Sequence, residues 1–195
     1  MTELEVKTII FQKPGKINTD RTLELAIARA ADLGLKKVLV ATTSGETGAR
    51  TAELFQDYDV VAVSHVTGFR EPNVQELTPE NRMIIESSGG IILTAQHALG
   101  GLNRAVRNKF GTYQLDEIIA HTFRLFGQGM KVVVEIALMA ADAGLARTDE
   151  PAMCIAGTGR GADTAAIVYP ANAHSFFDLS IPEIICRPAA KHPGF

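Results

Sequence analysis

Hydroxyl residues and glycines follow an apolar run early in the chain, where residues 42–48 read Thr-Thr-Ser-Gly-Glu-Thr-Gly. If residues 38–41 form a buried strand and a helix starts near Gly45, the unpaired N–H groups of its first turn attract an anion. Hydroxyl groups add donors, and glycines let a ligand approach the backbone. The alternative is a helix that uses Ser44 as its N-cap and binds nothing. The residues predicted to hold a phosphate are Thr42, Thr43, Ser44, Gly45, Glu46, Thr47 and Gly48.

A glycine-rich turn follows a second apolar run, and residues 157–161 read Gly-Thr-Gly-Arg-Gly. Residues 165–169 look like a strand rather than a helix, so the turn is not a dinucleotide fingerprint. Its successive N–H groups could still form an anion nest, with Arg160 as a charged donor. The alternative is a flexible hairpin with a solvated arginine. The predicted binding residues of this turn are Gly157, Thr158, Gly159, Arg160 and Gly161.

Two histidines follow two further apolar runs, and together they suggest acid–base chemistry or hydrogen bonds to a ring system. His65 and His97 each come directly after a predicted strand, and Thr67 follows the first of them. Either histidine alone would be an ordinary loop residue. Phe69 could stack on an aromatic ligand or cover the core. We assign no catalytic residue, and no acidic residue accompanies the histidines at a spacing that predicts a metal site.

The elements that position these residues alternate between short apolar runs and helical patterns, which predicts an α/β fold. The predicted strands are 8–11, 38–41, 60–63, 91–93, 153–156, 165–169 and 183–186. The predicted helices start near 19, 45, 79, 102, 115 and 130. We expect one domain over residues 1–195, a three-layer α/β/α sandwich with a mostly parallel sheet and an antiparallel strand near 165–169. The ligand should lie above 44–48, at the carboxyl ends of the strands.

Composition narrows the class of partner. The formal charge is −3, with 19 basic and 22 acidic side chains, so we expect neither nucleic acid nor a membrane as partner. Cys154 and Cys186 lie in apolar stretches and predict buried free thiols, which fits a cytoplasmic protein without a signal peptide. The segment 130–143 predicts a core helix. The residues we expect to be solvated or structural are Arg70, Arg82, Arg104, Arg107 and His121, and 188–195 should be irregular.

The two loops together resemble those of the pyruvate kinase C-terminal domain. Residues 42–47 resemble its Thr-x-Ser-Gly-x-Ser/Thr loop, which holds a phosphate of the allosteric sugar bisphosphate, and 157–168 resemble its later Thr-Gly-rich loop. Residues 14–19 read Pro-Gly-Lys-Ile-Asn-Thr, similar to the start of free-standing archaeal and bacterial proteins named for that domain. The catalytic barrel is missing from this sequence, so we expect no pyruvate kinase activity. Glu46 departs from the kinase pattern by placing a carboxylate beside the phosphate loop.

The resemblance implies a phosphate-bearing small molecule as ligand, with flavin mononucleotide (FMN) as the sharpest candidate. It leaves two classes of function open: a ligand-binding or sensory protein, and a small flavin-dependent oxidoreductase in which the cofactor supplies the chemistry. A homo-oligomer is compatible with the sequence. The substrate and the pathway are not indicated by the residues.

Overall fold

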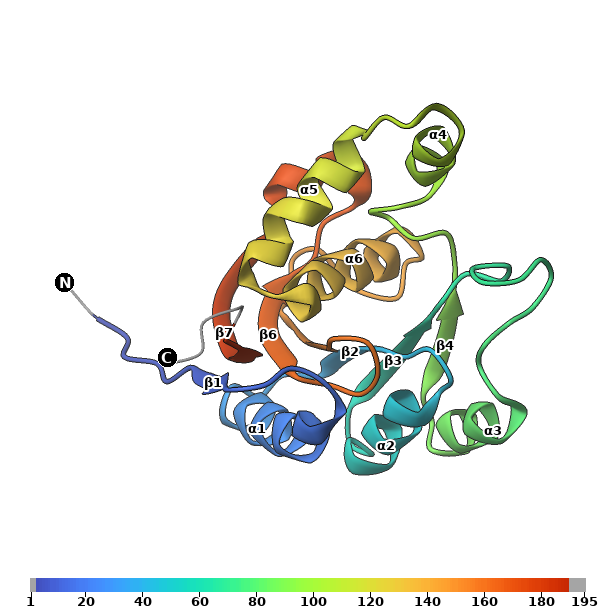
Figure 1. Ribbon diagram of the computed structural model, residues 1–195. Coiled ribbons are helices and arrows are strands. Elements are labelled where there is room, and N and C mark those ends of the chain that lie inside the picture. The colour runs from blue at the N-terminus through green and yellow to red at the C-terminus, as the bar shows by residue number, and fades with distance from the viewer. Residues whose placement is uncertain (1–2, 190–195) are drawn as a thin grey trace.

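The computed structural model describes residues 3–189 and builds within them a seven-stranded sheet in the order β1-β7-β6-β5-β2-β3-β4 (Figure 1). The strands are β1 (Ile9–Phe11), β2 (Lys37–Ala41), β3 (Asp59–Ser64), β4 (Ile91–Thr94), β5 (Ala152–Ala156), β6 (Thr164–Tyr169) and β7 (Ser180–Pro188). The α-helices are α1 (Thr19–Asp32), α2 (Glu46–Leu54), α3 (Pro79–Ser87), α4 (Leu102–Phe110), α5 (Leu115–Phe123) and α6 (Gln128–Asp142). Short 3₁₀ turns are η1 (Lys16–Asn18), η2 (Arg124–Phe126) and η3 (Ala173–Asp178).

Strand direction creates a ligand position at one edge of the sheet. β6 pairs antiparallel with both β5 and β7, and the other neighbouring strands pair in parallel. The chain leaves β2 toward β3 and β4 on one side, and β5 returns on the other side of β2. The connections after β2 and β5 therefore diverge and leave a crevice between them, which is where open α/β sheets bind ligands.

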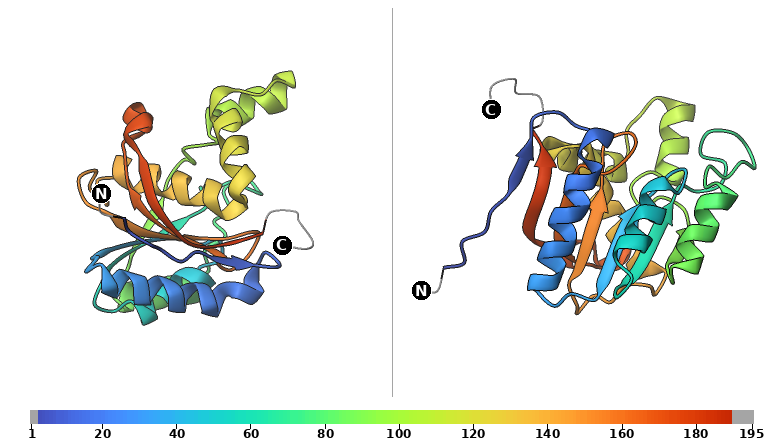
Figure 2. Two further views of the ribbon diagram at one scale, coloured as in Figure 1. Left: turned by 90° about the vertical axis from the view of Figure 1, so that its left-hand side faces the viewer. Right: turned by 90° about the horizontal axis from the view of Figure 1, so that it is seen from below.

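The sheet separates two helical layers, as Figure 2 shows edge-on. α1, α2 and α3 cover one face, and the core there includes Ala26, Phe55 and Ile85. α6 covers the other face, where Val133 and Ala137 pack on the strands, and α5 packs outside it through Ala120. Both faces of the central strands are therefore buried, which explains why their sequences are continuous apolar runs rather than alternating ones.

The predicted architecture is confirmed: the three layers, the mostly parallel sheet and the reversed strand at 164–169 are all present. The helix predicted to start near 79 is capped by Thr78, which accepts from Asn81 N at 3.3 Å, and Pro79 occupies the first helical position. The last strand is longer than predicted, because β7 pairs with both β6 and β1. Pro188 ends that strand, and the rest of the predicted irregular tail, from residue 190 on, lies outside the described residues.

The two cysteines are free and buried, as predicted. Burial raises the pKa of the Cys154 thiol, and it raises that of Cys186 to about 11, so both stay protonated at neutral pH. Neither thiol is a candidate nucleophile. Within residues 3–189, each helix is too short or too polar to cross a bilayer.

Candidate functional site

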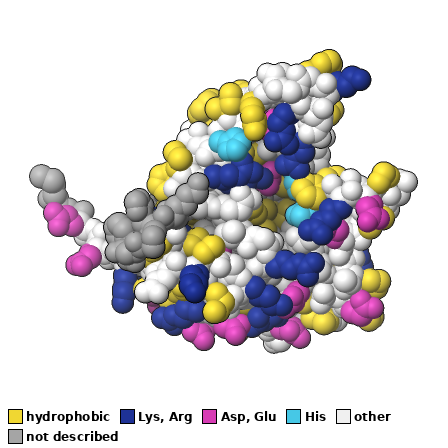
Figure 3. Space-filling model, viewed as in Figure 1, with side chains coloured by type: hydrophobic (Ala, Val, Ile, Leu, Met, Phe, Trp, Pro, Cys, Tyr) yellow, Lys and Arg dark blue, Asp and Glu magenta, His cyan; other side chains and the backbone are white. Residues whose placement is uncertain are grey.

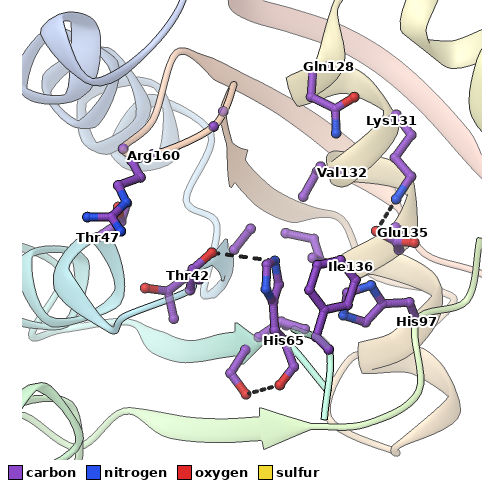
Figure 4. A pocket seen from close by; sticks show the side chains of 18 of the residues that line it. Thr42, Thr47, His65, His97, Gln128, Lys131, Val132, Glu135, Ile136 and Arg160 are labelled. Carbon is purple, nitrogen blue, oxygen red and sulfur yellow. Dashed lines mark hydrogen bonds and ion pairs between the residues drawn. The ribbon is translucent and has the colours of Figure 1, made fainter. Parts of the chain in front are cut away.

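A cavity of about 330 Å³ opens at the carboxyl edge of the sheet, between the loops after β2, β3 and β5 and the side of α6 (Figure 4). On the face drawn in Figure 3, Lys and Arg side chains gather around the hollow in the middle of the molecule. The cavity is lined by residues of the three loops and of the start of α2, which include Thr42, Thr43, Ser44, Glu46, Thr47, His65, Phe69, Gly157, Gly159, Arg160 and Gly161. Its lining residues from the remaining elements include His97, Arg104, Arg124, Gln128, Lys131, Val132, Glu135, Ile136 and Met139.

The loop after β2 is shaped by its own residues. Gly45 adopts a left-handed φ of 98° and starts α2, and a Cβ on it would lie 2.4 Å from that of Asn81. Thr42 Oγ1 accepts from the backbone N–H of Gly48 at 3.2 Å. Within residues 3–189 the backbone N–H groups of 43–47 have no hydrogen-bond partner. These five donors at a helix start are what an anion needs.

Ser44 does not cap α2, so the N-cap assigned to it in the alternative interpretation is wrong. The N-cap is Gly45, which has no side chain to accept a hydrogen bond, and the side chain that accepts from the first turn is that of Thr42. Instead the backbone carbonyl of Ser44 accepts from Thr78 N and from Asn81 Nδ2, at 3.1 and 3.0 Å. The Ser44 hydroxyl is thereby left available at the cavity.

The glycine turn after β5 also exposes backbone donors. Within residues 3–189 the N–H groups of Gly157, Gly159, Arg160 and Gly161 lack partners. The turn closes where Asp163 N donates to Ala156 O at 3.0 Å. Donors therefore concentrate here as they do in the first loop, and the two loops line the same cavity.

Asp163 and the segment before α1 fix this turn. The carboxylate of Asp163, which is fully buried, accepts from the N–H groups of Gly15 and Thr158 at 2.8 and 3.2 Å, and from the Thr164 hydroxyl at 2.8 Å. Thr19 Oγ1 accepts from Ala162 N at 3.0 Å. Residues 14–19 therefore hold the glycine turn in place, and we call this segment the clamp.

An ion pair explains how the carboxylate of Glu46 is tolerated beside the predicted phosphate loop. Its carboxylate lies 2.6 Å from Lys16 Nζ, and both side chains are about half exposed. This pair links the clamp segment to the loop after β2 and offsets the negative charge that Glu46 brings to the cavity rim.

Aromatic rings line a second end of the cavity. The His65 ring centroid lies 4.4 Å from that of Phe69 and 5.3 Å from that of His97, and Phe69 stacks on His97 at 5.0 Å. His65 Nδ1 donates to Glu76 at 2.7 Å, and its Nε2 lies 3.4 Å from the Thr43 hydroxyl. The two histidines therefore line one cavity.

His97 is held as a neutral ring. Its Nε2 accepts from Val66 N at 3.2 Å, and only 9% of the residue is exposed. Burial is the main cause that lowers its pKa to about 4; the charge of Glu135 opposes this shift, and the charges of Lys131 and Arg104 add to it. His97 can offer hydrogen bonds at neutral pH but is not a general acid there.

Helix α6 contributes a buried ion pair that the sequence analysis did not assign to the site. Lys131 Nζ donates to Glu135 Oε2, and Glu135 Oε1 accepts from Leu99 N at 3.2 Å. Both charged residues are at most 5% exposed, and burial lowers the pKa of Lys131. Figure 4 shows this pair beside His97, away from Arg160 and Thr47. The signal was a lysine and a glutamate four residues apart in an apolar helix.

Four predicted contact residues do not line the cavity. Gly45 and Gly48 face neighbouring elements, because a Cβ on Gly48 would lie within 3.2 Å of the side chains of Ile85, Thr42 and Ala62. Thr67 is exposed and its hydroxyl accepts from Gln75 at 3.4 Å. Thr158 directs its N–H to Asp163. These residues shape the loops rather than line the cavity.

Of the arginines predicted to be solvated, Arg70 and Arg82 are exposed as expected, whereas Arg104 is not. Arg104 lines the cavity, and its guanidinium carbon lies 5.2 Å from the centre of the Phe69 ring. Arg70 pairs with Glu76 at 3.0 Å and Arg107 with Glu117 at 3.2 Å. Arg82 pairs with Glu86 on the exposed side of α3. Within the described residues, no group of three or more histidine, cysteine or acidic side chains is arranged to hold a metal ion.

Comparison with known proteins gives a family match over most of the chain. Residues 20–168 match the family model described as "Pyruvate kinase, alpha/beta domain". That segment includes both loops at the cavity. Among solved structures, a similar one is the crystal structure of O-ureido-L-serine synthase, at 19% identity over 70% of this chain and a TM-score of 0.31. This chain spans about half (50%) of that chain, and a similarity this weak carries no argument about the site.

Proposed function

This chain belongs to the pyruvate kinase alpha/beta domain family, and we propose that it binds a phosphate-bearing small molecule, with FMN as the best candidate. In this proposal it acts as a ligand-binding or sensory protein. The phosphate lies between residues 43–47 and 157–161, and the rest of the ligand extends toward His65 and α6.

The observation that carries the proposal is the convergence of unpaired backbone donors. N–H groups without partners within residues 3–189 occur in both loops, and both loops line one cavity. Unpaired donors at a concave surface favour an anion, and the dipole of α2 adds to the attraction. Arg160 supplies a planar cation at the same end, where Figure 4 draws it near Thr47.

The residues at the other end fit a planar ring. His65, Phe69 and His97 form one aromatic cluster, and Val132 and Ile136 add apolar surface from α6. The cavity volume lies within the range of small-molecule sites. FMN combines a phosphate with a ring system, and when bound it supplies redox chemistry that the protein only positions.

Titration of the protein with FMN, followed by flavin fluorescence, tests the proposal. We expect saturable quenching with one site per chain, because the ring would stack on the aromatic cluster. Fluorescence that stays unquenched at millimolar protein would remove FMN as the ligand. Calorimetry with a sugar phosphate then tests whether the loops bind a phosphate from another metabolite.

A small flavin-dependent oxidoreductase is the second candidate, and the observation that favours it is the buried Lys131. Groups near the ring of a flavin tune its electronics, and Lys131, although paired with Glu135, can donate a further hydrogen bond at that end of the cavity. If FMN binds, anaerobic addition of NADH or NADPH distinguishes the two functions. Bleaching of the flavin absorbance that slows in Lys131→Gln supports the enzyme, and absorbance that stays constant supports the binding protein.

A further inference from the structure

A second cavity, of about 180 Å³, lies between α4, α5 and the start of η2, on the outer side of the first one. Arg104 and Arg124 line both cavities, so the two are neighbours. The remaining lining residues of the second cavity are Leu99, Arg107, Tyr113, Glu117, Ala120 and His121. His121, expected to be structural, is exposed here with its ring 5.5 Å from that of Tyr113.

Glu117 presents an unused acceptor to this cavity. The residue is only 6% exposed, and its Oε1 lies 3.2 Å from Arg107 Nε. Its Oε2 is buried and has no hydrogen-bond partner within residues 3–189. A buried carboxylate oxygen without a donor is costly, and native structures rarely leave one unless a ligand or water supplies the donor.

Two arginines at the same cavity are not neutralised by carboxylates. Arg107 is compensated by Glu117, but within the described residues neither Arg104 nor Arg124 forms an ion pair. Arg124 Nε donates to the neutral Gln128 at 2.7 Å, and Arg104 Nε is buried without an acceptor. The local charge is therefore about +2 by count of these side chains, which matches two carboxylates on a ligand.

We propose that this cavity is a second binding site, next to the first, for a small hydroxy-dicarboxylic acid. The two carboxylates pair with Arg104 and Arg124, and the hydroxyl group donates to Glu117 Oε2. A hydroxyl is favoured over an ammonium because two uncompensated arginines repel a cation. Leu99, Ala120 and the Tyr113 ring provide apolar surface for a short carbon chain, and the volume excludes a nucleotide.

Calorimetric titration with malate and succinate tests the proposal, because the two acids differ by one hydroxyl group. We expect one enantiomer of malate to bind the wild-type protein about tenfold more tightly than succinate, the usual effect of a hydrogen bond to a buried charge. Equal affinities for malate and succinate, or saturation by neither at millimolar concentration, would overturn the assignment without any variant.

Variants then assign the contacts. Glu117→Gln should reduce the preference for malate to about twofold while FMN fluorescence titration stays as in the wild type. Arg124→Gln should weaken both acids alike, and the matched control Arg82→Gln, on exposed α3, should change neither. A malate preference that persists in Glu117→Gln would overturn the role of Glu117. Since the comparison of ligands uses wild-type protein, a variant that fails to fold leaves the test intact.

Discussion

The two loops at the main cavity present similar donors but are held in different ways. In the loop after β2, Thr42 and Gly48 bond each other across six residues, and the Ser44 carbonyl accepts from Thr78 and Asn81 at the start of α3. In the turn after β5, the restraints come from Gly15 and Thr19, 148 residues from Asp163 and 143 from Ala162. Both loops therefore have tertiary contacts, but the donors of the first loop are exposed by the start of α2, whereas the donors of the glycine turn depend on a segment far away in sequence.

The largest expected effect comes from removing the anchor of the glycine turn. Asp163→Ala leaves three donors without their charged acceptor, so we expect a loss of about 4 kcal/mol in the free energy of unfolding and weaker FMN binding. Urea denaturation measures the first effect, with exposed Asp57→Ala as the control. Wild-type stability in Asp163→Ala would mean that the turn does not depend on the clamp.

A matched pair of glycines sharpens the same comparison. Gly161 and Gly159 both have left-handed φ, at 77° and 75°. A Cβ on Gly161 would lie 2.4 Å from Thr19 Oγ1, whereas a Cβ on Gly159 would have no described atom within 4 Å. We expect Gly161→Ala to cost about 3 kcal/mol and Gly159→Ala about 1 kcal/mol. Thermal or urea unfolding of both variants checks this. Equal losses of unfolding free energy would show that residues 14–19 move to accommodate the added methyl group without a cost in stability.

The pH dependence of the unfolding free energy tests the aromatic end of the cavity without testing the two loops, because neither loop contains a histidine. The pKa of His97 is about 4 in the folded state and 6.5 when unfolded. Below pH 6.5 the unfolded chain binds a proton that the folded one does not, so stability falls as pH drops toward 4. Between pH 7 and 5 we expect about 2 kcal/mol of loss.

The control for this pH effect is His97→Gln, which removes the titrating group. The difference in unfolding free energy between the wild type and the variant should change by the same amount across that interval. If the two proteins lose stability in parallel from pH 7 to 5, His97 is not the source.

The smallest effect on stability, and a clear one on binding, should come from the first loop. Ser44→Ala and Thr47→Val remove hydroxyls that have no hydrogen-bond partner within residues 3–189. We expect unfolding free energies within about 0.5 kcal/mol of wild type and FMN affinity lowered by about tenfold. Unchanged affinity in both variants would contradict the phosphate site at this loop.

The strands, the helices and the donors of the first loop could be predicted from local sequence patterns. Contacts between residues far apart in sequence could not be predicted in this way. Apolar runs and caps such as Thr78-Pro79 identify the strands and helices, since their spacing follows from backbone geometry. The donors of residues 43–47 could be predicted because a strand followed by a helix start places them. The role of Asp163 could not, because its partners include Gly15, far away in sequence.

The charged side of the cavity was missed for another reason. Lys131 and Glu135 are two charges in an apolar helix, and only the packing of α6 on the sheet turns them toward the cavity rather than water. The sequence of α4 around Arg104 is typical of a solvated helix. The position of Arg104 over the Phe69 ring depends on how α4 is oriented in the fold. The spacing of Lys131 and Glu135 indicates that they can pair, but it does not indicate that the pair lines a cavity.

The central claim is that two donor-rich loops hold a phosphate, and a comparison of FMN with riboflavin tests it most directly. The two ligands share the ring system and differ in the phosphate. We predict that FMN quenches with a dissociation constant at least about a hundredfold lower than that of riboflavin, since several charge-assisted hydrogen bonds are involved. Equal dissociation constants would show that the loops do not bind the phosphate and would contradict the account.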